Sequence, residues 1–199
     1  MAIKIYIDQG HGPGVNAGAE GFGLLEQDIT YMVGSYLADI FRLDDRFEVK
    51  TSRNSITENI GFNSSSSLRL RVNEANNWPA DYFISIHCNA SVNTSANGTE
   101  GYIYSTPSTA YDLSKSIVEE IVRRTGTKNN GIFTNPSLYV LRYTEMPATL
   151  IELAYISNFN DAVKLSSNQY QFAFGIYQGV LNYLGLNISD AVISMLGND

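Results

Sequence analysis

The two histidines of the chain are the first candidates for chemistry, because each follows an apolar run that is typical of a β-strand. His11 lies just beyond residues 3–8, and His87 closes residues 81–86. Ligands bind at the carboxyl edge of an open α/β sheet, so both imidazoles are expected there. A catalytic zinc site needs three protein ligands and one open position. The pattern predicts a zinc site that needs a third ligand, whereas each histidine alone is more typical of a hydrogen-bonded loop or core residue.

Glu152 is the second unusual residue, because it stands inside the apolar run 149–155. Burying an unpaired ionised carboxylate is costly, so this side chain must be ion-paired, protonated or close to a metal. One interpretation is an ion pair with Arg142 or Arg71. The other is a general base that takes a proton from a zinc-activated water and passes it to a leaving nitrogen. The second interpretation predicts amide hydrolysis.

Cys88 directly follows His87 but is not expected to join the site. Neighbouring residues of a strand point to opposite faces of the sheet. We therefore expect Cys88 to be a small buried hydrophobe.

The periodicity of apolar residues predicts the elements that must position these side chains. Strands and helices alternate along the chain, which indicates a single α/β domain with a twisted, mostly parallel (mixed) sheet of about six strands and helices on both faces. A long loop over residues 10–23 and a polar loop over 54–67 interrupt the pattern. The predicted strands are 3–8, 47–51, 81–88, 101–105, 139–142 and 149–156, and the predicted helices are 29–41, 68–75, 113–122 and 173–184.

Composition narrows the classes of function. With 13 basic and 20 acidic residues in 199, the chain lacks the basic field that binding to nucleic acid or an anionic membrane requires. Its single cysteine excludes a disulfide framework within the chain. No stretch has the length of a membrane span, and the first residues lack the features of a signal peptide. We expect a monomer with a catalytic domain over residues 1–185 and a tail or short helix over 186–199.

Several short motifs, in order along nearly the whole chain, resemble the zinc-dependent N-acetylmuramoyl-L-alanine amidases of the type 3 family. Each motif alone is weak, but their order makes the resemblance specific. The matching positions are residues 7–12 (IDQGHG), 18–19, 23–28 (GLLEQD), 51–53, 68, 71, 75–76, 81–90 (which contains SIHCN), 140–142, 147, 150–152 (LIE) and 157–158.

The resemblance assigns roles to individual residues. It implies that His11, Glu26 and His87 bind one zinc ion per chain and that Glu152 is the catalytic carboxylate. Spacing alone does not choose the third ligand among the acidic residues. Arg142 is a candidate substrate or oxyanion contact, with a structural ion pair as the alternative.

The same resemblance implies a substrate and a place of action. The substrate is peptidoglycan, cut at the amide between N-acetylmuramic acid and the L-alanine of the stem peptide. Such an enzyme acts at the bacterial cell wall, as an autolysin or endolysin that is extracellular or released by a phage or mother cell. The alternatives are a zinc peptidase that cuts within the stem and an inactive wall-binding or regulatory module.

Two departures from the family pattern concern loops. Residues 13–16 carry one extra residue, with Asn16 where an aspartate is frequent. The segment 91–100 is short and polar, so we expect an open cleft without an inserted inhibitory helix.

Overall fold

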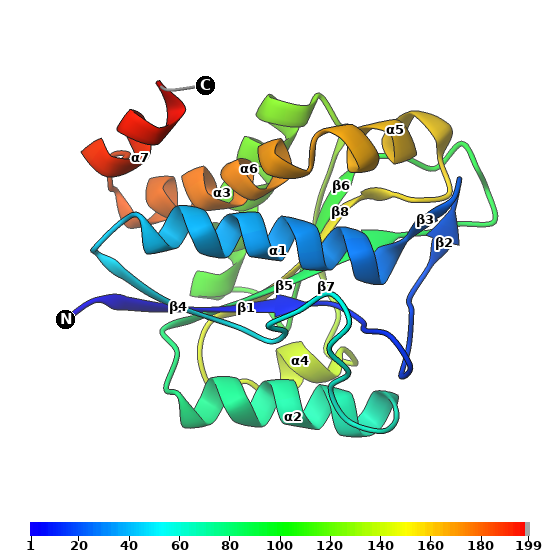
Figure 1. Cartoon of the computed structure of the whole chain (residues 1–199), viewed down its shortest axis with the longest axis horizontal. Coiled ribbons are helices and arrows are strands. Elements are labelled where there is room, and N and C mark those ends of the chain that lie inside the picture. Colours follow the sequence, from blue (N-terminus) through cyan, green and yellow to red (C-terminus); the bar gives the residue numbers. More distant parts are fainter. Residues whose placement is uncertain (198–199) are drawn as a thin grey trace.

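The computed structural model describes residues 1–197, and its centre is a six-stranded mixed sheet (Figure 1). The strand order is β4-β1-β5-β8-β6-β7, and β6 against β8 is the antiparallel pair of neighbours. The carboxyl ends of β1, β5 and β8 therefore meet at one edge of the sheet. The strands are β1 (Ile3–Gln9), β4 (Phe47–Thr51), β5 (Tyr82–Asn89), β6 (Thr99–Ile103), β7 (Asn129–Thr134) and β8 (Ala148–Tyr155).

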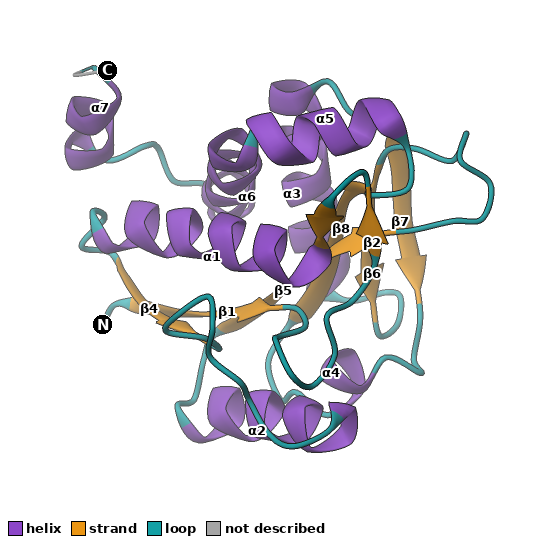
Figure 2. Cartoon of the chain, turned by 45° about the vertical axis from the view of Figure 1, so that its right-hand side comes forward, coloured by secondary structure: helices purple, strands orange, loops and turns teal. Residues whose placement is uncertain are grey.

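Helices cover both faces of the sheet (Figures 1 and 2). One face packs against α1 (Glu26–Arg42), α3 (Thr109–Thr125), α5 (Phe159–Ser167) and α6 (Gln169–Leu184). The other face packs against α2 (Ser64–Asn77) and the short α4 (Tyr139–Arg142). A small hairpin of β2 (Glu20–Gly21) and β3 (Leu24–Leu25) leads into α1, and α7 (Asp190–Leu196) follows α6.

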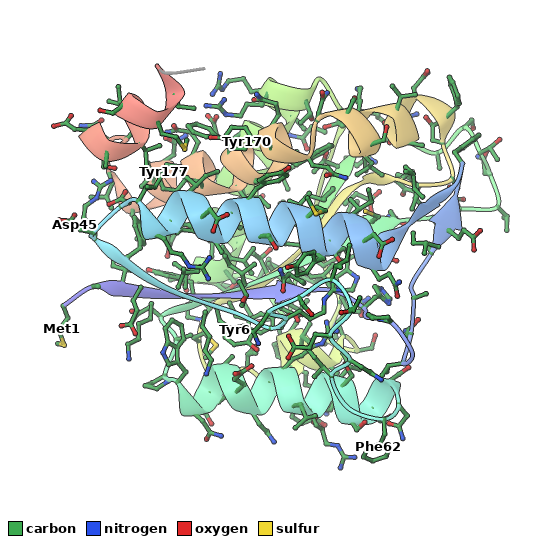
Figure 3. All side chains as sticks on the ribbon, in the orientation of Figure 1. Met1, Tyr6, Asp45, Phe62, Tyr170 and Tyr177 are labelled. Carbon is green, nitrogen blue, oxygen red and sulfur yellow. The ribbon has the colours of Figure 1, made fainter. Side chains whose placement is uncertain are left out.

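The core consists of two layers, one on each face, because strand side chains alternate between faces. Ile84 belongs to the cluster under α1 and α6, whereas its neighbour Phe83 belongs to the cluster against α2. Figure 3 shows the same division for two labelled tyrosines, with Tyr177 on the α6 side and Tyr6 on the α2 side. Cys88 is 3% exposed in the α1 and α6 layer, as predicted.

The predicted α/β class, sheet and long helices are confirmed, but the predicted strand at residues 139–142 is wrong. They form α4, in which Val140 and Leu141 are both buried. A short apolar run has the same pattern in a buried strand and in one buried helical turn. The sixth strand of the sheet is β7, which was not predicted. It is an edge strand, and its polar, half-exposed sequence lacks the apolar pattern of a buried strand.

The four serines at residues 64–67, which end the predicted polar loop 54–67, form the first turn of α2. Asn63 caps this helix, since its side chain accepts a hydrogen bond from the Ser66 amide and the Ser66 hydroxyl accepts one from the Asn63 amide. This reciprocal capping box satisfies amides that the first turn leaves without partners. The predicted boundary at residue 185 stays a prediction, although α7 lies within the predicted tail.

Candidate metal centre

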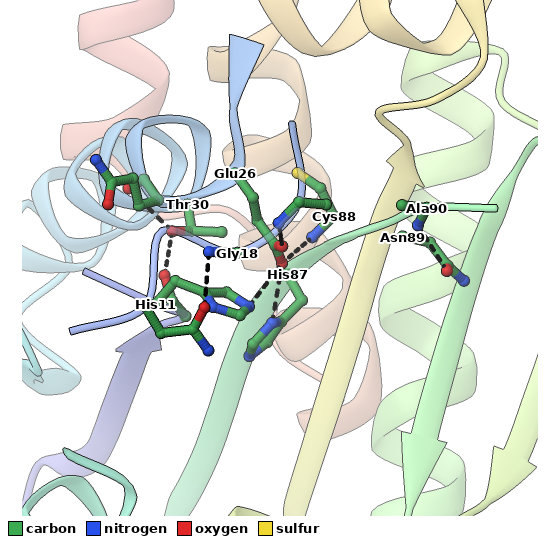
Figure 4. A network of polar contacts seen from close by, with 12 residues as sticks. His11, Gly18, Glu26, Thr30, His87, Cys88, Asn89 and Ala90 are labelled. Atoms are coloured by element: carbon green, nitrogen blue, oxygen red, sulfur yellow. Dashed lines mark hydrogen bonds and ion pairs between the residues drawn. The ribbon is translucent and has the colours of Figure 1, made fainter. Parts of the chain in front are cut away.

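Three side chains from separate elements converge at the carboxyl edge of the sheet (Figure 4). His11 lies in the loop after β1, Glu26 begins α1, and His87 is near the end of β5. Glu26 Oε1 is 3.2 Å from His11 Nε2 and 3.0 Å from His87 Nδ1. Ligands at about 2.0–2.1 Å from a tetrahedral zinc are separated by about 3.3 Å. The donor set and its spacing therefore fit a zinc ion.

Two glycines make room for these side chains. A Cβ on Gly10 would lie 2.6 Å from His87 Nε2, and one on Gly18 would collide with Glu26 Oε2 and lie 2.8 Å from His11 Cγ. Gly18 also has a φ of +77°, which L side chains rarely adopt. The glycines of the two N-terminal motifs are therefore steric requirements of the centre.

Glu26 is held as a carboxylate by donors on both oxygens. Oε1 accepts the Cys88 amide at 2.9 Å, and Oε2 accepts the Ala19 amide at 2.7 Å. Burial raises the pKa of Glu26, but the hydrogen bonds and charges of His11 and His87 outweigh burial and lower the pKa far below its ordinary value. A buried, ionised carboxylate beside two imidazoles is an electrostatic arrangement suited to a divalent cation.

A buried ion pair supports the loop that carries His11. Arg71 Nη1 donates to Asp8 Oδ1 and to the Gln9 carbonyl, both at 3.0 Å, and Arg71 Nη2 donates to the His11 carbonyl. The Ser85 hydroxyl donates to the other oxygen of Asp8 at 2.7 Å. His11 has a φ of +64°, an uncommon conformation for a residue with a side chain. Arg71 therefore secures a strained backbone at a proposed ligand.

Glu152 lies beside this centre, on the same face of the sheet as His87. It pairs with His87 across β5 and β8, and with Glu100 across β8 and β6. Its Oε2 is buried, with no hydrogen-bond partner among residues 1–197. Burial, followed by the negative charges of Glu26 and Glu100, raises the pKa of Glu152 well above its ordinary value.

The alternative in which Glu152 forms an ion pair is wrong. Arg71 is paired with Asp8, and Arg142 lies against the ring of Tyr143, 5.6 Å from its centroid. Glu152 has no ion pair within the described residues.

Arg142 is not brought together with the other predicted site residues. It is exposed at the end of α4 and lines a hollow of about 370 Å³ with Tyr104 and Ala148. Ala148 starts β8, whereas Glu152 lies toward the opposite end of that strand. The role of Arg142 as a substrate contact stays a prediction.

No role was predicted for Glu100 from the sequence. It is 6% exposed and accepts hydrogen bonds from Asn89, Tyr102, Asn130 and Tyr155, which lie on four different strands. Its position between Thr99 and Gly101 gave no periodic signal. Only the pairing of β6 with β8 places it beside Glu152.

Residues 5–182 match the family model described as N-acetylmuramoyl-L-alanine amidase. The chain belongs to this family. The match begins within β1, covers the other strands of the central sheet, and includes His11, Glu26, His87 and Glu152.

Two curated relatives and one solved structure illustrate the family likeness. The chain is 33% identical over 183 residues to the amidase LytC of Bacillus subtilis and 38% identical over 173 residues to the amidase CwlM of Bacillus licheniformis. These alignments cover 90% and 84% of this chain but 35% and 62% of the relatives' own lengths. The crystal structure of the amidase from Clostridium difficile 630 superposes with a TM-score of 0.82 at 32% identity, covering 92% of this chain and 97% of that one.

Proposed function

We propose that this chain is a zinc-dependent peptidoglycan amidase that cuts between N-acetylmuramic acid and the L-alanine of the stem peptide. The observation that carries the proposal is the convergence of His11, Glu26 and His87 beside the unpaired carboxylate of Glu152, within an amidase family. Action at the bacterial cell wall follows from that substrate.

His11, Glu26 and His87 would hold one zinc ion through two imidazole nitrogens and one carboxylate oxygen. A zinc ion bound there supplies Lewis acidity, which activates both a substrate carbonyl and a water molecule. Glu26 would offset part of the ion's charge, and the Ala19 and Cys88 amides fix the orientation of its carboxylate. Three protein ligands leave one position open, as hydrolytic zinc sites require.

Glu152 is proposed to move the proton. Its buried Oε2 has no competing hydrogen bond within the described residues, so it is free to accept a proton from the attacking water. The same oxygen then donates the proton to the nitrogen of L-alanine, which leaves as an amine while the muramyl lactyl group becomes a carboxylate.

Digestion of purified peptidoglycan with the zinc-loaded protein tests the proposed bond specificity. Mass spectrometry is expected to find intact stem peptides with a free L-alanine amino group. Truncated stems would instead identify a peptidase that cuts within the stem, and an absence of products would identify a binding module.

Metal analysis tests the ligands separately from the reaction. His87→Ala removes one of three donors and is expected to lose zinc on dialysis, whereas the wild-type chain retains about one ion. Tyr36→Ala, at a partly exposed position of α1 where the ring pairs with Tyr170, is a control that should retain the metal. Full zinc occupancy in His87→Ala would contradict the proposed role.

A further inference from the structure

The turn of the β2–β3 hairpin contains an aromatic residue where glycine or asparagine is normally required. Gly21 pairs with Leu24, so Phe22 and Gly23 form a two-residue loop. Their φ angles are +52° and +77°. Positive φ at both positions is the signature of a type I′ turn, whose preferred sequence is Asn-Gly. Phe22 therefore occupies a strained conformation.

Folding does not explain this choice of residue. The Phe22 side chain is 58% exposed, so it buries little surface to offset the cost of its backbone conformation. Its aromatic neighbour is Phe159, at the start of α5 and 63% exposed. The two rings meet edge to face with centroids 5.6 Å apart. They form an exposed aromatic pair held by two different elements.

The hairpin that carries Phe22 is closely connected to the proposed zinc centre. Phe22 is four residues before Glu26, a separation of at most about 13 Å for an extended chain. The hairpin backbone rests on the end of β8, where a Cβ on Gly21 would collide with the carbonyl of Ile156. The Ile156 amide in turn donates to the Asn89 carbonyl at 2.8 Å, just beyond His87. Hairpin and strand ends are thus one packed unit.

The surroundings of the pair indicate the chemistry of its ligand. The neighbouring segments 90–98 and 157–161 are rich in serine, threonine and asparagine and contain no Lys, Arg or His. The segments are in contact, since the Ser91 amide donates to the Ser157 hydroxyl and the Asn158 side chain donates to the Thr94 carbonyl. Aromatic faces bordered by amides and hydroxyls suit an uncharged sugar ring.

We propose that Phe22 and Phe159 form a platform on which the sugar portion of the substrate stacks during amide cleavage. The inference rests on the proposed function, since it assigns one part of that substrate to one side of the centre. The platform contributes to substrate binding and leaves the chemical step to the centre itself.

The test compares Phe22→Asn and Phe159→Ala with the wild type, all loaded with zinc. Tyr36→Ala is the matched control, because Tyr36 and Tyr170 form a similar edge-to-face pair between α1 and α6, with centroids 5.9 Å apart. Two substrates are used: a disaccharide tetrapeptide, and a D-lactoyl tetrapeptide that has the same scissile amide but no sugar. Calorimetric titration with the free disaccharide measures sugar binding independently of turnover.

For the disaccharide substrate, both Phe variants are expected to raise KM about threefold to tenfold with kcat changed less than about twofold. For the sugar-free substrate their kinetics should equal those of the wild type. Phe22→Asn should also raise Tm by about 2–4 °C, because asparagine suits the turn. A gain in stability together with a loss of sugar binding separates the platform from a structural role.

Unchanged KM on the disaccharide substrate would overturn the platform, and so would equal losses on both substrates, which would indicate peptide binding. Failure of the wild type to cleave either substrate would refute the proposed function. In that case calorimetry still decides the platform: weaker disaccharide binding by both Phe variants supports it, and unchanged or undetectable binding overturns it.

Discussion

Glu152 lies directly opposite His87 in the parallel ladder of β5 and β8. The pairing places a proposed metal ligand and a proposed proton carrier on the same face, in adjacent strands. Because both strands are central in the sheet and packed on both faces, neither side chain depends on a mobile loop for its position. Metal binding by His87 and proton transfer by Glu152 can therefore be tested separately by mutation.

Glu152→Gln is expected to keep zinc and lose turnover. The amide retains the size of the side chain but cannot accept the proton, and loss of a general base typically lowers kcat by about 10²–10⁴-fold. Zinc content and kcat measured on the same preparation check this. Activity close to that of the wild type would reject Glu152 as the base.

The same substitution should stabilise the metal-free protein at neutral pH. Burial and the charges of Glu26 and Glu100 raise the pKa of Glu152 above its unfolded value. A raised pKa contributes stability that is fully present below the unfolded pKa of about 4.3 and is lost as pH rises through the folded pKa. Glu152 therefore makes the metal-free protein less stable at pH 7 than at pH 4.

The free energy of unfolding of metal-free Glu152→Gln should exceed that of the wild type by on the order of 1 kcal/mol at pH 7, with little difference at pH 4. Urea titrations in a chelator at both values measure the two differences. An equal effect at both pH values would show that packing, rather than charge, accounts for the change.

Arg71→Met is expected to be strongly destabilising because it leaves Asp8 buried without its partner. Removing one member of a buried ion pair costs about 3–5 kcal/mol. The double variant Asp8→Asn with Arg71→Met removes the unpaired charge and should recover part of that loss. Urea unfolding of both variants tests the coupling, and equal stabilities would contradict it.

Gly18→Ala should weaken zinc binding by about 10–100-fold, the range found when groups that orient metal ligands are disturbed. The new Cβ would displace Glu26 and His11. Gly185→Ala is the matched control, since Gly185 also has a positive φ, +68°, but a Cβ added there would meet no other described residue within 4 Å. Competition with a chelating dye measures both affinities. Equal losses would assign the effect to backbone strain.

The positions of the two histidines were predictable because they depend on local patterns. Alternating apolar residues define β1 and β5, and a residue at the end of a parallel strand must lie at the carboxyl edge. The apolar run around Glu152 was informative for a similar reason. Burying an ionised carboxylate costs free energy, so a glutamate inside such a run indicates a partner or a function. Residues 139–142 were mispredicted because one buried turn of helix and a short strand share the same run of apolar residues.

The sequence by itself therefore determined the α/β class, the two histidine positions and the unusual carboxylate, since all three follow from local periodicity and the cost of burying charge. The family resemblance selected Glu26 as the third ligand, and the tertiary structure brings its carboxylate to the two histidines. Only the tertiary structure decided that Arg71 pairs with Asp8 and that Glu100 stands beside Glu152. These contacts join segments distant in the chain. They depend on strand order and register, which are set by packing of the whole sheet.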